Sequence, residues 1–333
     1  MNSDLKLRSD LDINQTTMAT TADYWVGSAI GEGSYGKVVH ARHKETNKDV
    51  AIKVVTKQSI KKEPSLLSGV WKERGLLTNL KSEYVVSLWA SFHDSECIYF
   101  VMECLAGGDL THVVQCGLER LNEWSLAIPY YALQVISALE FIHKRHVIHA
   151  DLKPDNVLVS TSGRIKLADF GSAVELNDTK LDSIRFMGTA DYASPEVVRG
   201  MTSISFGVDL WSLGCLLYAM WEGASPFHDQ SDALAIKRIV EYKGTQLQAQ
   251  NLNGNWETLI RDLLSPEVSN RLGMADCERT REGGVFYASI RDRSCLQSDE
   301  EVAFRASEPS WWTQTRKNKL RDGAEGWSIF LLS

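Results

Sequence analysis

The side chains best suited to chemistry are concentrated in one segment near the middle of the chain, His149-Ala150-Asp151-Leu152-Lys153-Pro154-Asp155-Asn156. Asp151 can accept the proton of an attacking hydroxyl, Lys153 can neutralise a migrating phosphoryl group, and Asn156 can bind a magnesium ion. Downstream, Asp169 in the sequence Asp-Phe-Gly can bridge magnesium to the phosphates of a nucleotide. Because phosphoryl transfer needs mainly positioning and charge neutralisation, these residues predict that chemistry.

A glycine-rich segment, Gly31-Glu32-Gly33-Ser34-Tyr35-Gly36, lies between two strand-like runs near the N-terminus. This spacing alone is weak evidence, because dinucleotide-binding folds place the same pattern before a helix. Here a strand-like run follows, so we expect a hairpin whose backbone N–H groups lie against a triphosphate while Val38 covers an adenine ring. The alternative is a tight hairpin that binds no ligand.

Lys53 ends the strand-like run Val50-Ala51-Ile52, and Glu73 lies in the helical segment that follows. A lysine in an enclosed site needs a carboxylate partner to stay charged and aimed, and such a pair orients the α- and β-phosphates of a nucleotide. Most lysines at the end of a strand are simply solvated. The position of Lys53 after the glycine-rich segment favours the phosphate-binding interpretation.

The composition is that of a packed globular protein, with 333 residues, 44% of them hydrophobic, and a formal net charge of −7. This acidic balance argues against nucleic acid as a main partner. The longest uncharged apolar run, from Leu210 to Trp221, is shorter than the roughly 20 residues that a membrane-spanning helix needs, so no direct membrane insertion is expected. Six cysteines without paired spacing indicate reduced thiols, which favours a cytoplasmic location and leaves nuclear access open.

The apolar pattern changes along the chain. Short runs between turn signals predict strands from Tyr24 to Phe100, and helical spacing begins at Asp109. We therefore expect a sheet-rich lobe before a helix-rich one. The predicted boundaries are a disordered tail at 1–22, the first lobe at 23–105, the second lobe at 106–290 and a C-terminal extension at 291–333.

The chain resembles the eukaryotic protein kinases from roughly Tyr24 to Gly273, in the motifs above and in three others. These are Ser194-Pro195-Glu196, where the family has Ala-Pro-Glu, then Asp209-Leu210-Trp211-Ser212-Leu213-Gly214, and Arg271. The resemblance implies an α+β, bilobal fold with a small antiparallel-sheet lobe that carries one main helix and a larger, mostly helical lobe. It also implies ATP and Mg²⁺ as cofactors.

The same resemblance implies the roles of individual residues. The catalytic residues would be Asp151, Lys153, Lys53, Glu73 and Thr189, and the metal ligands would be Asn156 and Asp169. The nucleotide would contact Ile30, Gly31, Glu32, Gly33, Ser34, Gly36, Val38, Ala51, Lys53, Glu103, Leu105, Asp109, Asp155 and Leu158. By likeness to the family, Glu196 and Arg271 would form a buried salt bridge, Asp209 would brace the backbone of the catalytic loop, and His149 would stack on Phe170.

Lys153 after the catalytic aspartate, together with Thr189, is typical of serine/threonine kinases, since their contact leaves space for a short hydroxyl side chain. The segments GTADYASPE, NRLG and ALEFIHKRHVIH are similar to the AGC group, and within it to the phosphoinositide-dependent protein kinases. Those kinases phosphorylate the activation loops of other AGC kinases after docking their hydrophobic motif. Too few residues remain after Gly273 for a pleckstrin-homology domain, so direct phosphoinositide binding is not expected.

The likeness implies a docking pocket for AGC kinases in the first lobe. Its apolar floor would be Ile60, Leu67, Val70 and Ile98, and its polar rim, able to hold phosphate, would be Lys57, Arg74, Ser91 and His93. The alternative for the four apolar residues is ordinary packing of a helix on a sheet.

Two positions depart from the family pattern. Ala150 replaces the arginine that normally grips a phosphate on the activation loop, and Arg185 stands where the resembled kinases have the loop serine. We therefore expect the loop to be held without phosphorylation, with Arg185 pairing Asp182 or Glu175. Two other functions remain open: an AGC- or Aurora-like kinase with other substrates, and a nucleotide-binding pseudokinase scaffold, which Ala150 alone supports.

Overall fold

The computed structural model divides into two units. Unit 1 comprises Met1–Asn79, Val86–Cys104 and Ser310–Ser333, and unit 2 comprises Leu80–Val85 and Leu105–Pro309. The structure describes residues 19–33, 36–176, 189–201, 204–245, 247–252, 254–280, 287–296 and 321–322. Arg185 and one of its expected partners, Asp182, lie in the segment at 177–188, outside the described residues, as does Ser34. The other expected partner, Glu175, is described and lies in a short strand.

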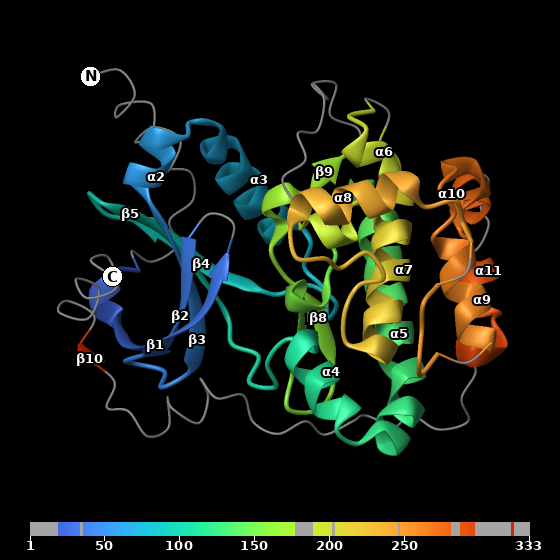
Figure 1. The fold of residues 1–333 in the computed structure, drawn as a ribbon. Coiled ribbons are helices and arrows are strands. Elements are labelled where there is room, and N and C mark those ends of the chain that lie inside the picture. Colours follow the sequence, from blue (N-terminus) through green and yellow to red (C-terminus); the bar gives the residue numbers. More distant parts are fainter. Residues whose placement is uncertain are drawn as a thin grey trace. The chain divides into compact units, whose positions relative to one another are not determined.

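The described strands of unit 1 form one antiparallel sheet in the order β10-β1-β2-β3-β5-β4 (Figure 1). The strands are β1 (Tyr24–Gly33), β2 (Gly36–His43), β3 (Asp49–Thr56), β4 (Leu88–His93), β5 (Cys97–Glu103) and β10 (Arg321–Asp322). The short strand β10 comes from the expected C-terminal extension and pairs with β1 at Trp25 and Val26. Thr20 caps a single 3-10 turn, Thr21–Asp23, directly before β1.

The two faces of this sheet bury different side chains, because successive residues of a strand point to opposite faces. Ile52 and Val54 of β3 belong to one apolar cluster, with Tyr99 and Val101 of β5. Val55 belongs to a second cluster, on the face covered by helices α2 (Lys57–Lys62) and α3 (Ser65–Asn79). Lys53 is two residues from Val55, so its side chain lies on the face that α3 covers.

Unit 2 is mostly helical (Figure 1). Its helices are α4 (Leu110–Leu118), α5 (Leu121–His143), α6 (Pro195–Val198), α7 (Gly207–Glu222), α8 (Asp232–Glu241), α9 (Gly254–Leu263), α10 (Met274–Thr280) and α11 (Ala288–Arg291). Single 3-10 turns are η2 (Pro154–Asn156), η3 (Phe170–Ser172), η4 (Ala190–Tyr192), η5 (Val268–Asn270) and η6 (Ser294–Leu296). Two short antiparallel pairs complete it, β6 (Val147–Ile148) with β9 (Val174–Glu175) and β7 (Val157–Val159) with β8 (Ile165–Leu167).

Helices α5 and α7 form the core of unit 2. All but the last residue of α7 is buried, and Trp124 of α5 donates its indole N–H to the carbonyl of Met220 in α7 at 2.6 Å. Helix α5 is long and apolar enough to cross a membrane by length and composition, but more than half of that stretch is buried inside the protein. That degree of burial is what a core helix of a globular unit shows. The expected α+β fold, with a sheet-rich lobe and a larger helical lobe, is confirmed.

A buried ion pair joins distant parts of unit 2. The Arg271 guanidinium donates to both carboxylate oxygens of Glu196 at 2.7 and 3.1 Å, and both side chains are almost completely buried. Arg271 also donates to the carbonyls of Gly207 and Ser265. The salt bridge expected from the resemblance is therefore confirmed, and it ties α6 to the N-terminus of α7 and to the loop before η5.

Replacing Arg271 with Met should lower the free energy of unfolding of unit 2 by about 3–5 kcal/mol, because Glu196 would stay buried without a partner. Urea titration followed by tryptophan fluorescence measures the change. The matched control is Lys237→Ala, since Lys237 lies 4.0 Å from Glu241 on the exposed face of α8 and such pairs contribute roughly 0–1 kcal/mol. Equal effects of the two substitutions would show that the buried pair is not a structural anchor.

Candidate active site

The catalytic loop predicted from the sequence lies between β6 and η2 in unit 2, and a buried carboxylate holds its start. Asp209 of α7 accepts hydrogen bonds from the backbone N–H groups of His149 at 2.7 Å and Ala150 at 2.9 Å. Ala150 has φ of 62°, in the left-handed region that residues other than glycine seldom adopt. The two bonds from consecutive amides hold this turn, and the expected bracing role of Asp209 is confirmed.

A chain of hydrogen bonds continues behind Asp209 to a residue near the end of unit 2. His143, the last residue of α5, lies with Nε2 2.7 Å from Asp209 Oδ2, and Tyr287 is hydrogen-bonded through its hydroxyl to His143 Nδ1. All three side chains are buried. A carboxylate only accepts hydrogen bonds, so His143 donates Nε2–H to Asp209, and the Tyr287 hydroxyl is the partner of Nδ1.

The electrostatics of Asp209 follow from these contacts. Burial by itself raises the pKa of this carboxyl, but the hydrogen bond and charge of His143, together with the nearby His149, outweigh it and hold the pKa below its ordinary value. Asp209 is therefore ionised when it accepts the bonds from the catalytic loop. Hydrogen bonds to a charged acceptor are stronger than those to a neutral one, so the loop is held firmly.

Asp151, the predicted base, is buried and held from two sides. Asn156 donates its Nδ2 to the Asp151 backbone carbonyl at 2.7 Å and to its Oδ2 at 3.0 Å. The backbone N–H of Thr189 donates to Oδ1 at 3.2 Å. Burial raises the pKa of Asp151, and Lys153 and His149 lower it in part. A raised pKa makes the carboxylate a better proton acceptor for a hydroxyl.

Lys153 lies beside both of its expected partners. Its Nζ donates to the hydroxyl of Thr189 at 2.5 Å and lies 3.5 Å from Asp151 Oδ2. The structure thus brings Asp151, Lys153, Asn156 and Thr189 together within one part of unit 2. These four residues form one hydrogen-bonded group, which we call the Asp151 cluster.

Asp169 follows β8 and adopts the left-handed conformation, with φ of 57°. Its carboxylate accepts from the N–H of Gly171 at 3.4 Å, and Phe170 is fully buried against the His149 ring, with centroids 4.9 Å apart. The backbone N–H of Ala168 donates to the carbonyl of Asn156 at 2.9 Å. The two predicted metal ligands, Asn156 and Asp169, therefore lie on backbone segments that are hydrogen-bonded to each other.

In unit 1 the predicted lysine and glutamate form a buried ion pair. Lys53 Nζ lies 2.8 Å from each carboxylate oxygen of Glu73, and both residues are almost fully buried. Glu73 shares the buried face of α3 with Val70 and Leu77, at the three- and four-residue spacing that places side chains on one side of a helix. The predicted contact between these two residues is present within unit 1.

The glycine-rich segment forms the expected hairpin. Gly33 of β1 pairs with Gly36 of β2, and Val38 lies opposite Lys53 of β3. A Cβ atom at Gly36 would lie 2.0 Å from the carbonyl oxygen of Val54, so only glycine fits there. Ile30 and Gly31 lie in the strand before the hairpin tip.

The remaining nucleotide contacts predicted for unit 1 lie near β3 and β5. Ala51 lies opposite Met102, and Glu103 follows Met102 at the end of β5. Glu103 Oε1 accepts from the backbone N–H of Ser87 at 2.7 Å, which holds that side chain against the strand. Recognition at Glu103 would therefore use its backbone.

The nucleotide contacts predicted for unit 2 take up distinct structural positions. Asp109 caps α4 by accepting from the N–H of His112 at 2.8 Å, and burial raises its pKa. Asp109 also pairs with Leu158 of β7 in an isolated bridge. Leu105 is buried, whereas Asp155 in η2 is exposed.

The residues expected to form the docking pocket do not all remain accessible. Ile60, Val70 and Ile98 are buried together in the cluster that joins α2 and α3 to the sheet, and Leu67 packs against it partly buried. This is the packing of helices on a sheet that the alternative interpretation describes.

The polar rim of that surface forms two contacting pairs. Arg74 Nε donates to Ser91 Oγ at 2.8 Å, and Lys57 Nζ lies 3.5 Å from His93 Nδ1. Lys57 Nζ also donates to the carbonyl of Asp94 at 2.5 Å. The rim cations are therefore held in place on unit 1.

The sequence of most of the chain matches a known family. The protein kinase domain, as a sequence family, matches residues 24–281. The chain belongs to the protein kinase family. That match contains the hairpin, the Lys53–Glu73 pair, the Asp151 cluster and the buried Arg271–Glu196 pair, and Tyr287 lies beyond it.

Curated relatives include several serine/threonine kinases. The 3-phosphoinositide-dependent protein kinase 1 of Arabidopsis thaliana is 38% identical over 232 residues, 66% of this chain and 46% of that protein. Serine/threonine-protein kinase Sgk1 of Rattus norvegicus is 32% identical over 275 residues, 82% of this chain and 62% of that protein. Rho-associated protein kinase let-502 of Caenorhabditis briggsae is 39% identical over 292 residues, 82% of this chain and 24% of that protein. The chain thus spans between 24% and 62% of these relatives, and the expected resemblance to AGC kinases is confirmed.

Sequence reasoning missed two members of the hydrogen-bond chain behind the catalytic loop. In the sequence, His143 stands only within the segment ALEFIHKRHVIH, and Tyr287 belongs to no motif. The position of His143 just before a helix end, next to the loop motif, is a signal that could have found it. Tyr287 gives no local signal, because its partner is 144 residues away in the chain.

Replacing Tyr287 with Phe should lower the free energy of unfolding by about 0.5–1.5 kcal/mol, because His143 Nδ1 would lose its hydrogen-bond partner. It should also speed amide hydrogen exchange at His149 and Ala150, whose N–H groups bond to Asp209. Exchange followed by NMR or mass spectrometry checks this.

Tyr218→Phe is the matched control for Tyr287→Phe. The hydroxyl of Tyr218 is likewise hydrogen-bonded within unit 2, in its case to the carbonyl of Gln248. It should change stability comparably without affecting exchange at the catalytic loop. Equal exchange at His149 in both variants would mean that Tyr287 does not help to hold the loop.

Proposed function

We propose that this chain is an active serine/threonine protein kinase that transfers the γ-phosphoryl group of Mg-ATP to a hydroxyl of a protein substrate. The observation that carries the proposal is the Asp151 cluster, in which a buried carboxylate with a raised pKa is hydrogen-bonded to Asn156 and lies beside Lys153. A base, a cation and a metal-binding amide in one group are what phosphoryl transfer needs.

Each residue of the cluster has a step to perform. Asp151 accepts the proton of the substrate hydroxyl as the oxygen attacks phosphorus. Lys153 neutralises the negative charge of the migrating phosphoryl group, and its bond to Thr189 aims the ammonium. The bond from Asn156 to Oδ2 keeps the carboxylate of Asp151 in one orientation, so its other lone pairs face the substrate.

The residues present fit a magnesium ion. Asn156 uses Nδ2 for both of its bonds to Asp151, which leaves Oδ1 for a hard cation, and Asp169 contributes a carboxylate. Mg²⁺ is usually bound by one or two carboxylates together with substrate phosphates and water, so this small ligand set suits it. When bound, the ion neutralises charge on the β- and γ-phosphates. Lys53, kept charged and aimed by Glu73, is assigned to the α- and β-phosphates.

The contacts of Thr189 support serine or threonine as the acceptor. Its hydroxyl accepts from Lys153 and its N–H donates to Asp151, so the segment at 189–192 is drawn close to the base. Close approach of this segment leaves room for a short hydroxyl side chain beside Asp151 and disfavours the longer reach of tyrosine.

A finer proposal concerns substrates. Similarity to a 3-phosphoinositide-dependent protein kinase supports other AGC kinases as substrates, recruited by their hydrophobic motif. On unit 1 we assign this docking to the accessible part of Leu67 and the rim of Lys57, Arg74, Ser91 and His93. The two rim cations, Lys57 and Arg74, would bind a phosphate on the hydrophobic motif. A cytoplasmic location with access to the nucleus remains part of the proposal.

Replacing Asp151 with Asn should reduce phosphate transfer from Mg-ATP by about 10²–10⁴-fold, because the amide cannot accept the hydroxyl proton. The assay follows transfer to an unphosphorylated AGC activation-loop peptide, and nucleotide binding by the variant should persist. Undiminished turnover in the variant would contradict the role of Asp151. Nucleotide binding by the unaltered chain without transfer to this or any generic peptide would instead support a pseudokinase scaffold.

Replacing Arg74 with Ala should weaken binding of a phosphorylated hydrophobic-motif peptide to unit 1 about tenfold, the loss of one charge-assisted contact. Fluorescence anisotropy measures it, and Lys61→Ala on α2 is the matched control because it removes one exposed cation outside the rim. Transfer to a generic peptide should not change. If the peptide binds both variants equally, or not at all, the docking assignment is wrong while the kinase proposal stands, and an AGC- or Aurora-like kinase with other substrates is favoured.

A further inference from the structure

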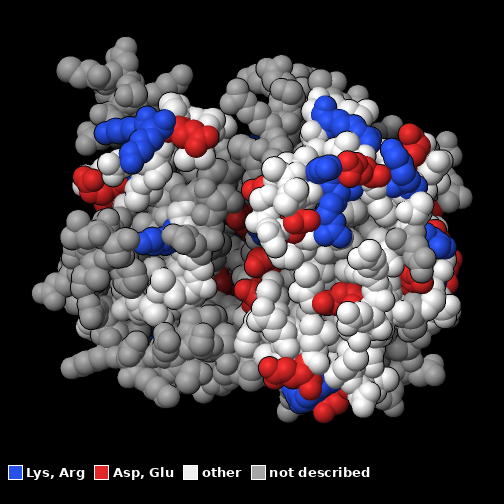
Figure 2. Space-filling view, in the orientation of Figure 1, with Lys and Arg blue, Asp and Glu red and all other residues white. Residues whose placement is uncertain are grey.

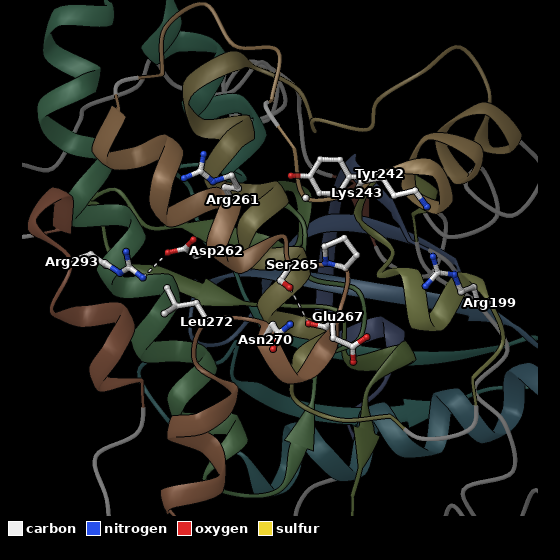
Figure 3. A pocket seen from close by; sticks show the side chains of 12 residues that line it. Arg199, Tyr242, Lys243, Arg261, Asp262, Ser265, Glu267, Asn270, Leu272 and Arg293 are labelled. Atoms are coloured by element: carbon white, nitrogen blue, oxygen red, sulfur yellow. Dashed lines mark hydrogen bonds and ion pairs between the residues drawn. The ribbon is translucent and has the colours of Figure 1, made fainter.

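A cavity of about 740 Å³ lies within unit 2, away from every residue predicted for catalysis, nucleotide binding or docking (Figure 3). Its walls come from the residue after α6, the loop after α8, helix α9, the loop that leads to η5, and Arg293. Lining residues include Arg199, Tyr242, Lys243, Arg261, Leu272 and Arg293. Neither the family match nor the sequence motifs assign a role to this cavity.

The lining carries more positive than negative charge. Four cations face two carboxylates, Asp262 and Glu267, in a chain whose formal net charge is −7. Arg293 Nη2 forms an ion pair with Asp262 Oδ2 at 2.7 Å, and Glu267 Oε1 accepts a hydrogen bond from Ser269 Oγ at 3.4 Å. Excess positive charge in a concave site raises the local concentration of anions.

Three of the four cations lack an ionic partner. The side chains of Lys243 and Arg261 have no ion pair or hydrogen bond with any residue that the structure describes. Arg199 donates one bond, to the carbonyl of Val240 at 3.5 Å, and all three residues are exposed. In Figure 3, Arg199 and Lys243 lie on one side of the cavity and Arg261 and Arg293 on the other, so the positive charge faces it from two directions.

The lining between the cations is mixed, since it contains Ser265 and Asn270 in addition to apolar side chains. Its apolar members are Tyr242, Pro266 and Leu272, and Tyr242 packs edge-on against Phe227, with ring centroids 5.3 Å apart. The loop at 265–272 is held by buried Arg271, whose Nε donates to the Ser265 carbonyl at 3.1 Å. A preformed site loses less entropy on binding than a mobile one.

We propose that this cavity binds an acidic segment of a protein partner that carries a phosphorylated serine or threonine. A phosphate dianion matches Arg199 and Lys243 on one side, and a neighbouring acidic side chain matches Arg261 on the other. The mixed polar and apolar lining and the volume suit a peptide segment better than a lone phosphate ion. A membrane surface fits less well, because the cations line a concavity on a chain that is acidic overall.

The test uses a fluorescein-labelled, Glu-rich peptide with one phosphoserine and no hydrophobic motif, with binding followed by anisotropy in the absence of ATP. Replacing both Arg199 and Lys243 with Ala should weaken binding at least tenfold, and Arg261→Ala should weaken it several-fold. Lys237→Ala, which removes an exposed cation on α8 outside the lining, should leave affinity unchanged. The unphosphorylated peptide should bind more weakly, and the affinity should fall between about 50 and 200 mM salt.

Binding that is equal in the double variant and in Lys237→Ala would overturn the proposal. Binding that is lost in Arg74→Ala would assign the peptide to unit 1 instead, which also overturns it. If vesicles of anionic lipid bind through Arg199 and Lys243 and the peptide does not bind, the ligand of this cavity is a membrane surface and the proposal is wrong. Asp151→Asn should bind the peptide as tightly as the unaltered chain, so the outcome is independent of the proposed phosphoryl transfer. Thermal unfolding of each variant confirms that the exposed substitutions leave the fold intact.

Discussion

Asp209 is fully buried in α7, and its charge determines where the catalytic loop lies. A carboxylate in the protein interior is stable only if hydrogen bonds replace the water that it loses. Here two backbone amides and His143 do so, and the amides belong to the loop that carries Asp151. The requirement that a buried charge be compensated is thus what makes a strained turn at Ala150 the stable conformation. The positions of Asp151, Lys153 and Asn156 depend on that turn, because these residues follow it in the same loop.

The same requirement appears at two other places in the chain. In unit 1 the ammonium of Lys53 is compensated by Glu73, and in unit 2 the Arg271 guanidinium is compensated by Glu196. Buried ion pairs contribute little net stability compared with apolar residues, but breaking one is costly. Figure 2 shows charged side chains scattered over the visible face of the molecule, where solvent screens them. The buried carboxylates of Asp209, Glu73 and Glu196 are different, because each holds a distant segment of the chain in position.

The sequence predicted the features that depend on short spacing. Asp151, Lys153 and Asn156 lie within one loop, so their contact follows from the chain itself. The Lys53–Glu73 pair could be predicted from the resemblance and from the strand period that places Lys53 on the face covered by α3. The apolar docking floor was harder, because a pattern of apolar residues cannot distinguish a pocket floor from a core. Ile60, Val70 and Ile98 turned out to be core.

Two features built from distant residues, the contact of Tyr287 with His143 and the cavity of Figure 3, belong to no motif in the sequence. Tyr287 and His143 meet only because α5 and the segment before α11 pack together, and a tyrosine at that place looks like any other buried aromatic. The cavity of Figure 3 likewise collects its four cations from four separate segments, none of which forms a basic run. Long-range packing decides such contacts, and local propensity does not register them.

Ala150 shows how the family resemblance and the backbone structure together explain one position. In the resembled kinases an arginine at this place links the catalytic loop to a phosphate on the activation loop, and here no side chain can do so. The backbone conformation of this position nevertheless depends on Asp209, whose bonds are to N–H groups and do not require any particular side chain. Thr189 then holds Asp151 from the other side through its own N–H and through Lys153. The base therefore keeps the contacts that orient it although position 150 is an alanine.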